Sequence, residues 1–597
     1  MTKNRVKTIF VISLLVAFVN TKNSIDETHE VLLNEEFDFK FKWRIDREDI
    51  LIEMSANSLG YVAIGFSPNG GMPGSDIVVG WVKDDEAFLS DRHAKTNSMP
   101  EVDVSSDYDI QYGFEEGGRT TIGFKRTLNT CDDDDYVINS DTARVIWAVN
   151  EMDPEDTDNL IYHGPSRGVR SVVLLNAPEK SITLPEDVAS FELFMPNVTV
   201  PSDSDTTYWC TSFAVPAFDN PVHVVRFETI VQEGHESLVH HLIAYSCNSE
   251  NVNWSGICYT SNMPDDFWNC RRMIYGWAVG SGPLDFPDHA GLSLGRGNDS
   301  TIILIEMHYD NPGHSADFHD NSGVRVYYTP TLRQYEAEVW MIGEEVSPLQ
   351  SIPPNEKAFK TFGFCFGDCT KQVLEEDIKI IAVGLHGHLA ATKISLQHYR
   401  NGSLIDDLAR DDNYDFNLQE FRYFETEKVF KPGDEFVVTC VYKTVGRENI
   451  TVGGLGTRQE MCLAFVVYYP KQSKAGACLS SPDRFAFYNT FNISEYDICN
   501  YWSPQCLIET LGSVEPSVLR DGLRQVSYGS KRRNYCMNYE WDNIGDVQLY
   551  DFPAWFSEND RVVKKGVCTM PTNGSVSRKV MSLSLSITLI LSCKLTL

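Results

Sequence analysis

The chain has 597 residues, a length that exceeds one hydrophobic core and predicts three or four folded units. Hydrophobic residues make up 42% of the sequence, which is typical of globular rather than disordered proteins. The formal net charge of −33 argues against nucleic-acid binding, because that function needs a basic surface. The charge favours solubility and gives at most a mild preference for cationic ligands.

A basic N-terminus followed by a short apolar run predicts a secretory signal peptide. Lys3, Arg5 and Lys7 precede the apolar residues 9–19. This run is too short to span a bilayer comfortably, as expected of a signal sequence. We place the signal peptide at residues 1–23.

The cysteines and the glycosylation sequons agree with a secretory route. The chain has 15 cysteines, and beside a signal peptide these favour disulfide bonds over cytosolic thiols. We therefore expect the protein on a lumenal or extracellular face, in the endoplasmic reticulum or at the cell surface. Sequons for N-linked glycans occur at Asn197, Asn253, Asn298, Asn401, Asn449, Asn492 and Asn573.

The first folded unit, residues 28–185, is predicted to be all-β. Short apolar runs such as 37–43, 51–54 and 61–66 are separated by clusters of Gly, Pro and Asn. This spacing is typical of a β-sandwich. No amphipathic stripe of helical period interrupts the runs.

Two further all-β units are predicted, at residues 190–345 and 350–520. Their strongest strands are rich in β-branched and aromatic residues. After about Ser480 the strand pattern weakens to a few plausible turns, and residues 521–575 form a C-terminal segment. The strongest strands are 222–227, 238–245, 301–309, 378–385, 436–442 and 463–469.

Residues 580–597 form a second apolar segment. It is short and serine-rich for a spanning helix, and the small residues before it also fit a signal for a lipid anchor. Both alternatives attach the protein to a membrane. Burial of the segment within the fold is the third alternative.

Histidines lie in or beside several of the strongest strands. His386 and His388 are separated by one glycine, and residues i and i+2 of a strand point to one face, so the pair predicts a chelate. His240 and His241 are adjacent, and both can reach one ion only at a strand end, bend or bulge. His308 would supply a third nitrogen.

Met461 indicates which metal these residues bind. A thioether is a soft ligand and favours Cu(I) over zinc or calcium. A site of three imidazoles beside a site of two imidazoles and one thioether predicts copper redox chemistry. Each motif alone is weak, because a lone His-x-His is more often structural and a lone methionine usually packs in a core.

In this order, the motifs resemble those of the copper type II, ascorbate-dependent monooxygenases. The motifs are His240-His241 and the runs 306–312, 385–388 and 460–470. Near the front, residues 65–76 and 80–82 resemble a DOMON domain. The combination resembles the dopamine β-monooxygenase branch, with its DBH-like monooxygenases as the best match.

The resemblance implies an all-β architecture of three β-sandwiches. A DOMON domain would occupy residues 28–185. Two jelly-roll-like copper domains would follow at 190–345 and 350–520. Disulfides would tether the C-terminal segment 521–575.

The resemblance also implies roles for individual residues. An electron-donating copper would be held by His240, His241 and His308, and an oxygen-binding copper by His386, His388 and Met461. Tyr208 matches an active-site tyrosine of the family, and His386 matches its catalytic partner. With two coppers per chain and ascorbate as electron donor, the protein would use O2 to hydroxylate a C–H bond of a small substrate, for which an amine is one candidate.

The disulfide pairing is likewise implied by the resemblance, because sequence spacing alone does not select a connectivity. Cys499 and Cys506 are left as a further candidate pair, and Cys593 is left over in the apolar tail. The implied pairs are Cys131–Cys568, Cys210–Cys258, Cys247–Cys270, Cys365–Cys478, Cys369–Cys536 and Cys440–Cys462.

Two other functions are weighed against the hydroxylase. A peptidylglycine hydroxylase would share the copper motifs, but the DOMON-like front disfavours it. A copper-binding or cell-surface interaction protein would use the same scaffold without catalysis. Both alternatives keep copper as the bound metal.

Overall fold

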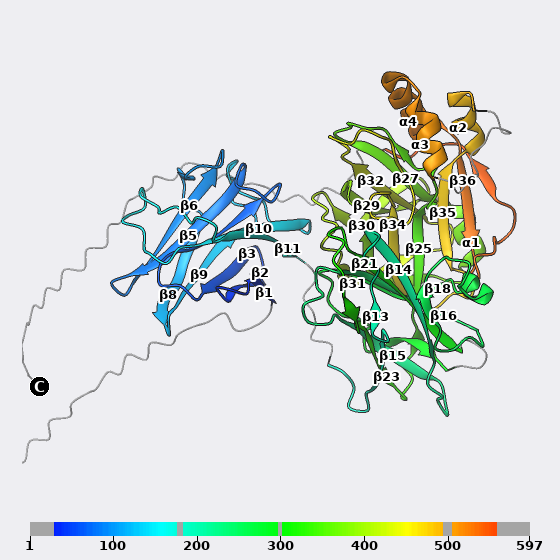
Figure 1. Cartoon of the computed structure of the whole chain (residues 1–597), viewed down its shortest axis with the longest axis horizontal. Coiled ribbons are helices and arrows are strands. Elements are labelled where there is room, and N and C mark those ends of the chain that lie inside the picture. The colour runs from blue at the N-terminus through cyan, green and yellow to red at the C-terminus, as the bar shows by residue number, and fades with distance from the viewer. Residues whose placement is uncertain (1–28, 176–182, 296–300, 494–503, 558–597) are drawn as a thin grey trace, which may run out of the picture.

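The computed structural model describes residues 29–175, 183–295, 301–493 and 504–557, and it is built almost entirely of β-strands (Figure 1). The all-β prediction is therefore confirmed. Several predicted features lie outside the described residues. These are the signal peptide 1–23, the apolar tail 580–597, the sequons at Asn298 and Asn573, and Cys499, Cys568 and Cys593.

The first unit is a sandwich of two antiparallel sheets around a shared core. In the strand Phe39–Asp46, Phe39, Phe41 and Trp43 are buried and the lysines between them are partly exposed, which is the alternation of a half-buried strand. One sheet has the order β1 (His29–Asn34), β2 (Phe39–Asp46), β3 (Asp49–Ala56), β9 (Arg119–Thr127), β8 (Asp109–Glu116). The other has the order β11 (Arg167–Val173), β10 (Thr142–Val149), β4 (Val62–Ser67), β5 (Ser75–Lys83), β6 (Glu86–Ala94), β7 (Glu101–Val102).

The second unit also has two main sheets. One has the order β12 (Ala189–Phe194), β23 (Gly323–Thr329), β15 (Val222–Ile230), β20 (Ala290–Leu294), β24 (Tyr335–Glu336), with β19 (Leu284–Asp285) on β15. The other has the order β17 (Ser255–Ile257), β14 (Thr206–Ala214), β21 (Ile302–Asp310), β16 (Val239–Cys247), β18 (Arg272–Ala278). A short pair, β13 (Val198–Thr199) with β22 (His319–Asp320), and a 3-10 turn at Asp265–Asn269 complete it.

The third unit packs a seven-stranded sheet beside a four-stranded one. The larger has the order β31 (Phe421–Phe430), β28 (Ile378–His386), β34 (Leu463–Tyr469), β25 (Glu338–Glu344), β35 (Ala477–Pro482), β36 (Arg532–Met537), β37 (Gln548–Tyr550). The smaller has the order β27 (Phe359–Cys365), β32 (Glu435–Tyr442), β29 (Ala391–Arg400), β30 (Ser403–Asp411). The pair β26 (Ser351–Ile352) and β33 (Thr451–Val452) and the helix α1 (Gly367–Val373) lie outside these sheets.

The third unit extends beyond both ends of the predicted range 350–520. Strand β25, which precedes the expected domain start at residue 350, pairs with β34 and β35 and so belongs to this unit. Strand β36 of the C-terminal segment pairs with β35, so this segment extends the same sheet.

Three helices follow β35, where sequence analysis anticipated only turns. They are α2 (Arg484–Phe491), α3 (Pro504–Gly512) and α4 (Pro516–Gly529). Two residues mark the start of α4. The Glu515 side chain accepts hydrogen bonds from the backbone N–H groups of Ser517 and Val518, and Pro516 occupies the first turn. Its residues Leu519, Leu523 and Val526 are buried, at the spacing of one helix face.

Disulfides fasten the second and third units internally. The first four bonds are Cys210–Cys258, Cys247–Cys270, Cys365–Cys478 and Cys369–Cys536, and a fifth joins Cys440 to Cys462. All five have the expected pairing. For the expected Cys131–Cys568 bond, Cys568 lies outside the described residues.

The second and third units share one hydrophobic core. Leu242 and Met307 of the second unit belong to the same buried cluster as Ala382, Val467 and Tyr469 of the third. Strands β16, β21 and β28, which carry the histidine motifs, all contribute to this cluster. The common core therefore holds the histidines of the two units close together.

The surface agrees with the expected glycosylation. Asn197, Asn253, Asn401, Asn449 and Asn492 are all exposed, as an acceptor of a bulky glycan must be. Within the described part of the chain, we find no helix with both the length and the apolar character needed to cross a membrane.

Trp340 is the largest fully buried side chain of the third unit, and it packs against Phe430, Phe436 and Tyr468. We expect Trp340→Ala to destabilise the fold by about 3–5 kcal/mol, because a cavity replaces the ring. The measurement is the urea midpoint of unfolding. Leu332, which is 47% exposed, gives the control Leu332→Ala, and equal midpoints for both variants would contradict the packing role.

Candidate metal centre

A β-bulge at the start of β16 turns two adjacent histidines toward one point. The pairing of β16 with β21 shifts register between Val239 and His241, so His240 is the extra residue of the bulge. The Nδ1 atoms of His240 and His241 lie 3.2 Å apart. Strand β16 thus has the bulge that allows two adjacent histidines to approach one metal ion.

His308 completes the first histidine group from the neighbouring strand. On β21 it is the cross-strand partner of His241, and its Nδ1 lies 3.2 Å from that of His241. Ring nitrogens that each lie about 2.0 Å from one ion in tetrahedral geometry are about 3.3 Å apart. The three side chains are buried with their ligand atoms within 4.8 Å of one another, a geometry that suits a bound metal ion.

His386 and His388 lie at the end of β28, and their rings are 5.2 Å apart. The Nδ1 of His386 donates to Oε1 of Gln419 at 2.7 Å, and the Nδ1 of His388 donates to the Gln459 carbonyl at 3.0 Å. Both bonds leave Nε2 for a metal. The Nε2 of His388 is buried and has no protein partner.

Met461 is anchored beside this second pair. Its carbonyl accepts from the Tyr442 hydroxyl at 2.8 Å, and the next residue, Cys462, is disulfide-bonded. The Glu460 carboxylate accepts from the backbone N–H of His388 at 3.0 Å. These bonds tie Met461 and His388 into one network.

Gly387 allows the two segments to approach. A Cβ at this position would lie 2.9 Å from the Ala391 Cβ and 3.2 Å from the Met461 carbonyl. Both distances are too short for most side chains, so glycine keeps the histidine pair close to the methionine segment.

Burial lowers the pKa of all five histidines. For His240 and His388 the pKa falls to about 3, with burial as the main cause and the charge of His386 as a further one. The rings are therefore neutral near pH 7, and neutral imidazole is the form that binds metals. The same direction holds for His241, His308 and His386.

The two candidate ligand groups, His240–His241–His308 and His386–His388–Met461, face each other across a narrow gap. The rings of His241 and His386 are 6.1 Å apart. Phe416 lies between the groups, since its ring stacks on His240 at 3.9 Å and lies 5.8 Å from His388. The two groups therefore form one compound site across the unit boundary.

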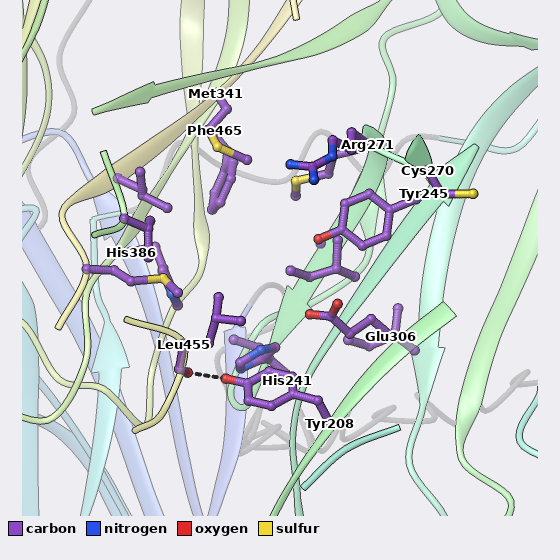
Figure 2. Close-up of a pocket in the computed structure, with 18 of the residues that line it drawn as sticks. Tyr208, His241, Tyr245, Cys270, Arg271, Glu306, Met341, His386, Leu455 and Phe465 are labelled. Carbon is purple, nitrogen blue, oxygen red and sulfur yellow. Dashed lines mark hydrogen bonds between the residues drawn. The ribbon is translucent and has the colours of Figure 1, made fainter. Parts of the chain in front are cut away.

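A cavity of about 770 Å³ adjoins this site, between the second and third units. Figure 2 shows His241, Glu306 and Tyr245 on one side of it and His386 and Phe465 on the other. Met461 also lines it. Most lining residues are aromatic or aliphatic, so a ligand there is largely removed from water.

Glu306 is the carboxylate of this cavity nearest the first histidine group. It lies two residues before His308 on β21, is 4% exposed, and accepts a hydrogen bond from the Tyr259 hydroxyl. Burial raises its pKa to about 7. Arg271, which also lines the cavity, donates to the Trp268 carbonyl.

Tyr208 bridges the two units at the edge of the cavity. Its ring stacks on His308 with centroids 4.6 Å apart, and its hydroxyl donates to the Leu455 carbonyl of the third unit (Figure 2). Burial raises the pKa of the phenol. Tyr208 therefore stays protonated and contacts both halves of the site.

Sequence analysis missed four residues that touch the ligands or their loop. Glu460 stands directly before Met461, and that position was its only signal. Tyr414, Phe416 and Gln419 lie in an irregular segment between β30 and β31, and no motif or periodicity marks them. Their contacts come from tertiary packing alone.

The arrangement of donors fits copper, which accepts imidazole in both oxidation states and thioether as Cu(I). Three stretches of the chain match known domain families. Residues 35–150 match the DOMON domain, 191–316 the N-terminal domain of copper type II ascorbate-dependent monooxygenases, and 335–491 their C-terminal domain. The chain belongs to the copper type II ascorbate-dependent monooxygenase family, whose cofactors are copper and ascorbate.

The relatives point to one branch of this family. DBH-like monooxygenase protein 1 of Homo sapiens is 40% identical over 464 residues, 76% of this chain and 75% of the relative. DBH-like monooxygenase protein 2 of Mus musculus is 36% identical over 466 residues, 77% and 73% of the two chains. Dopamine beta-hydroxylase of Canis lupus familiaris is 32% identical over 484 residues, 79% and 77% of the two chains.

The Cys440–Cys462 bond holds the segment of Met461 on β32. We expect the double variant Cys440→Ser, Cys462→Ser to bind less copper at the His386–His388–Met461 group, because its third ligand is less confined. Metal analysis after dialysis measures this loss. The control is Cys369→Ser, Cys536→Ser, which breaks a bond without a neighbouring ligand, and full copper loading of the first variant would refute the expectation.

Proposed function

We propose that this chain is an active copper- and ascorbate-dependent monooxygenase that hydroxylates a C–H bond of a small amine. The observation that carries the proposal is the convergence of His240, His241 and His308 in the second unit, opposite His386 and Met461 of the third unit across one mostly apolar cavity. In this reaction one oxygen atom of O2 enters the C–H bond and the other leaves as water. Ascorbate supplies the electrons.

Six side chains would hold the two coppers. One copper would be bound by His240, His241 and His308, and the other by His386, His388 and Met461. When bound, the coppers supply electron transfer and oxygen activation. The protein supplies neutral imidazoles, fixed ring orientations through Gln419 and Gln459, and a cavity that excludes water.

Tyr208 is proposed to act with His386 at the active site. Its ring rests on His308 and its hydroxyl reaches the third unit. This position supports a role in keeping the two ligand groups at a fixed distance. The high pKa of its phenol argues for a hydrogen-bond donor rather than a base.

An amine substrate is supported by the position of Glu306. Its carboxylate lies at the wall of a mostly apolar cavity, two residues from His308. A buried carboxylate without a cationic protein partner attracts an ammonium group. The aromatic walls would hold the apolar part of the substrate.

The cellular location is proposed from the sequence and the disulfides. The five disulfide bonds require an oxidising compartment. We place the protein in the secretory pathway, on a lumenal or extracellular face. The apolar segment 580–597 would attach it to a membrane.

Copper stoichiometry tests the two-metal proposal. We expect two coppers per chain in the wild-type protein and a weakened second copper in Met461→Ala, because the soft ligand for Cu(I) is lost. Metal analysis of the secreted protein and ascorbate-dependent O2 consumption are the two readouts. No copper, or one copper that is indifferent to Met461, would overturn the hydroxylase proposal; two coppers without O2 consumption over a panel of small amines would favour a non-catalytic copper protein.

The variant Glu306→Gln tests the substrate class. We expect kcat/KM for an amine substrate to fall about 10–100-fold, because the ammonium group loses its charged partner. A neutral analogue of the same shape would lose much less. Arg271→Gln is the matched control in the same cavity, and a larger loss in that variant would favour an anionic substrate.

A further inference from the structure

A strap that runs from the last residue of β30 to the second residue of β31, residues 411–422, docks the first unit onto the third. The Asp411 carboxylate accepts from the backbone N–H of Thr142 at 3.1 Å and from its hydroxyl at 2.6 Å. Both residues are almost fully buried. Arg422, at the other end of the strap, binds the same carboxylate at 2.9 Å.

The next residues of the strap continue this docking. Asn413 donates to the Thr142 carbonyl at 2.7 Å. Asp415 accepts from the Ser171 hydroxyl at 2.6 Å. Arg144 donates to the Asn413 side chain and to the carbonyl of the following residue. These partners come from β10 and β11, on the side of the first unit that faces the other two (Figure 1).

The opposite side of the strap touches the metal-ligand groups. The Tyr414 hydroxyl bonds both the carbonyl and the N–H of Gly387, at 2.8 and 3.1 Å, and Gly387 joins the histidines of the second group. The Phe416 ring stacks on His240. Gln419 accepts from His386.

The two sides alternate along the backbone. Residues 411, 413 and 415 bind the first unit, whereas 414 and 416 contact the ligand groups. A displacement of the strap away from the first unit would therefore move both ligand groups.

We propose that the first unit positions the metal ligands of both groups through this strap. Tyr414, Phe416 and Gln419 are its positioning residues, and the docked first unit is what fixes them. The inference rests on the proposed copper-binding function. It assigns to the first unit a task inside the catalytic centre, although none of its residues belongs to either ligand group.

The test uses the full chain with the docking variant Thr142→Val, Arg144→Ala. Both residues lie in the first unit and contact neither ligand group. We expect hydrogen exchange of the strap to become at least about tenfold faster in the metal-free protein, because its anchoring bonds are lost. In the copper-loaded protein we expect an altered Cu(II) EPR spectrum and faster copper loss from both groups to a chelator.

The matched control is Arg119→Ala. Arg119 belongs to the other sheet of the first unit, pairs with Asp38, and is about as exposed as Arg144, 23% against 18%. It should leave the strap and the copper spectrum unchanged. Unchanged spectra and copper retention in the docking variant would overturn the inference, whereas a wild-type protein that binds no copper would overturn the proposed function itself.

A second pair of variants tests the strap without altering the first unit. Gln419→Leu removes the acceptor for His386, and Gln419→Glu keeps it. We expect the leucine variant to lose copper affinity at the second group about 10–100-fold, with the EPR spectrum restored in the glutamate variant. If the leucine variant bound copper at the second group as tightly as the glutamate variant, Gln419 would not position His386.

Discussion

The burial of five uncharged imidazoles is the constraint on which this structure depends. A polar ring in a protein interior needs partners for its nitrogens. Backbone and amide oxygens satisfy Nδ1 in His386 and His388. In the first group the Nδ1 atoms of His240 and His308 each lie 3.2 Å from that of His241, and the Nε2 atoms of His240 and His308 are buried without a hydrogen-bond partner among the described residues. A metal ion bound among the converging Nδ1 atoms, as proposed, would take a lone pair from each ring.

The arrangement of strands explains how distant residues meet at one place. Tyr208, His308 and His241 occupy neighbouring strands at matching register positions, so the sheet itself places them in a row. The second group is held differently, at a strand end and in a loop that a disulfide and Glu460 confine. One half of the site is thus rigid through sheet pairing, and the other through side-chain bonds.

Much of this could be predicted from the sequence, because the informative residues obey local rules. Two adjacent histidines can reach one ion only at a strand end, a bend or a bulge, and β16 has a bulge at this point. Alternating apolar runs predicted the β-fold. The helices α2 to α4 were missed, although Glu515, Pro516 and the spacing of Leu519 and Leu523 are helix signals in α4.

Other features of the structure have no local signal in the sequence. Gln419 and Phe416 stand in a segment without periodicity, and only the folding of two units around it brings them to His386 and His240. The same is true of β25, whose partners β34 and β35 lie more than one hundred residues further along the chain and place it in the third unit. Such contacts arise from long-range packing, which a single sequence does not encode in a readable pattern.

The placement of the disulfides has a further consequence. Each of the five disulfides whose two cysteines are both described lies within the second unit or within the third, and none of the five joins one unit to the other. The links across the boundary are noncovalent: the shared hydrophobic core, the Arg272–Glu338 ion pair at 2.8 Å, and the hydrogen bond of Tyr208 to Leu455. Oxidation therefore fixes the strands within each half, while the alignment of the two halves depends on the common core, in which Leu242 and Met307 pack with Ala382 and Val467.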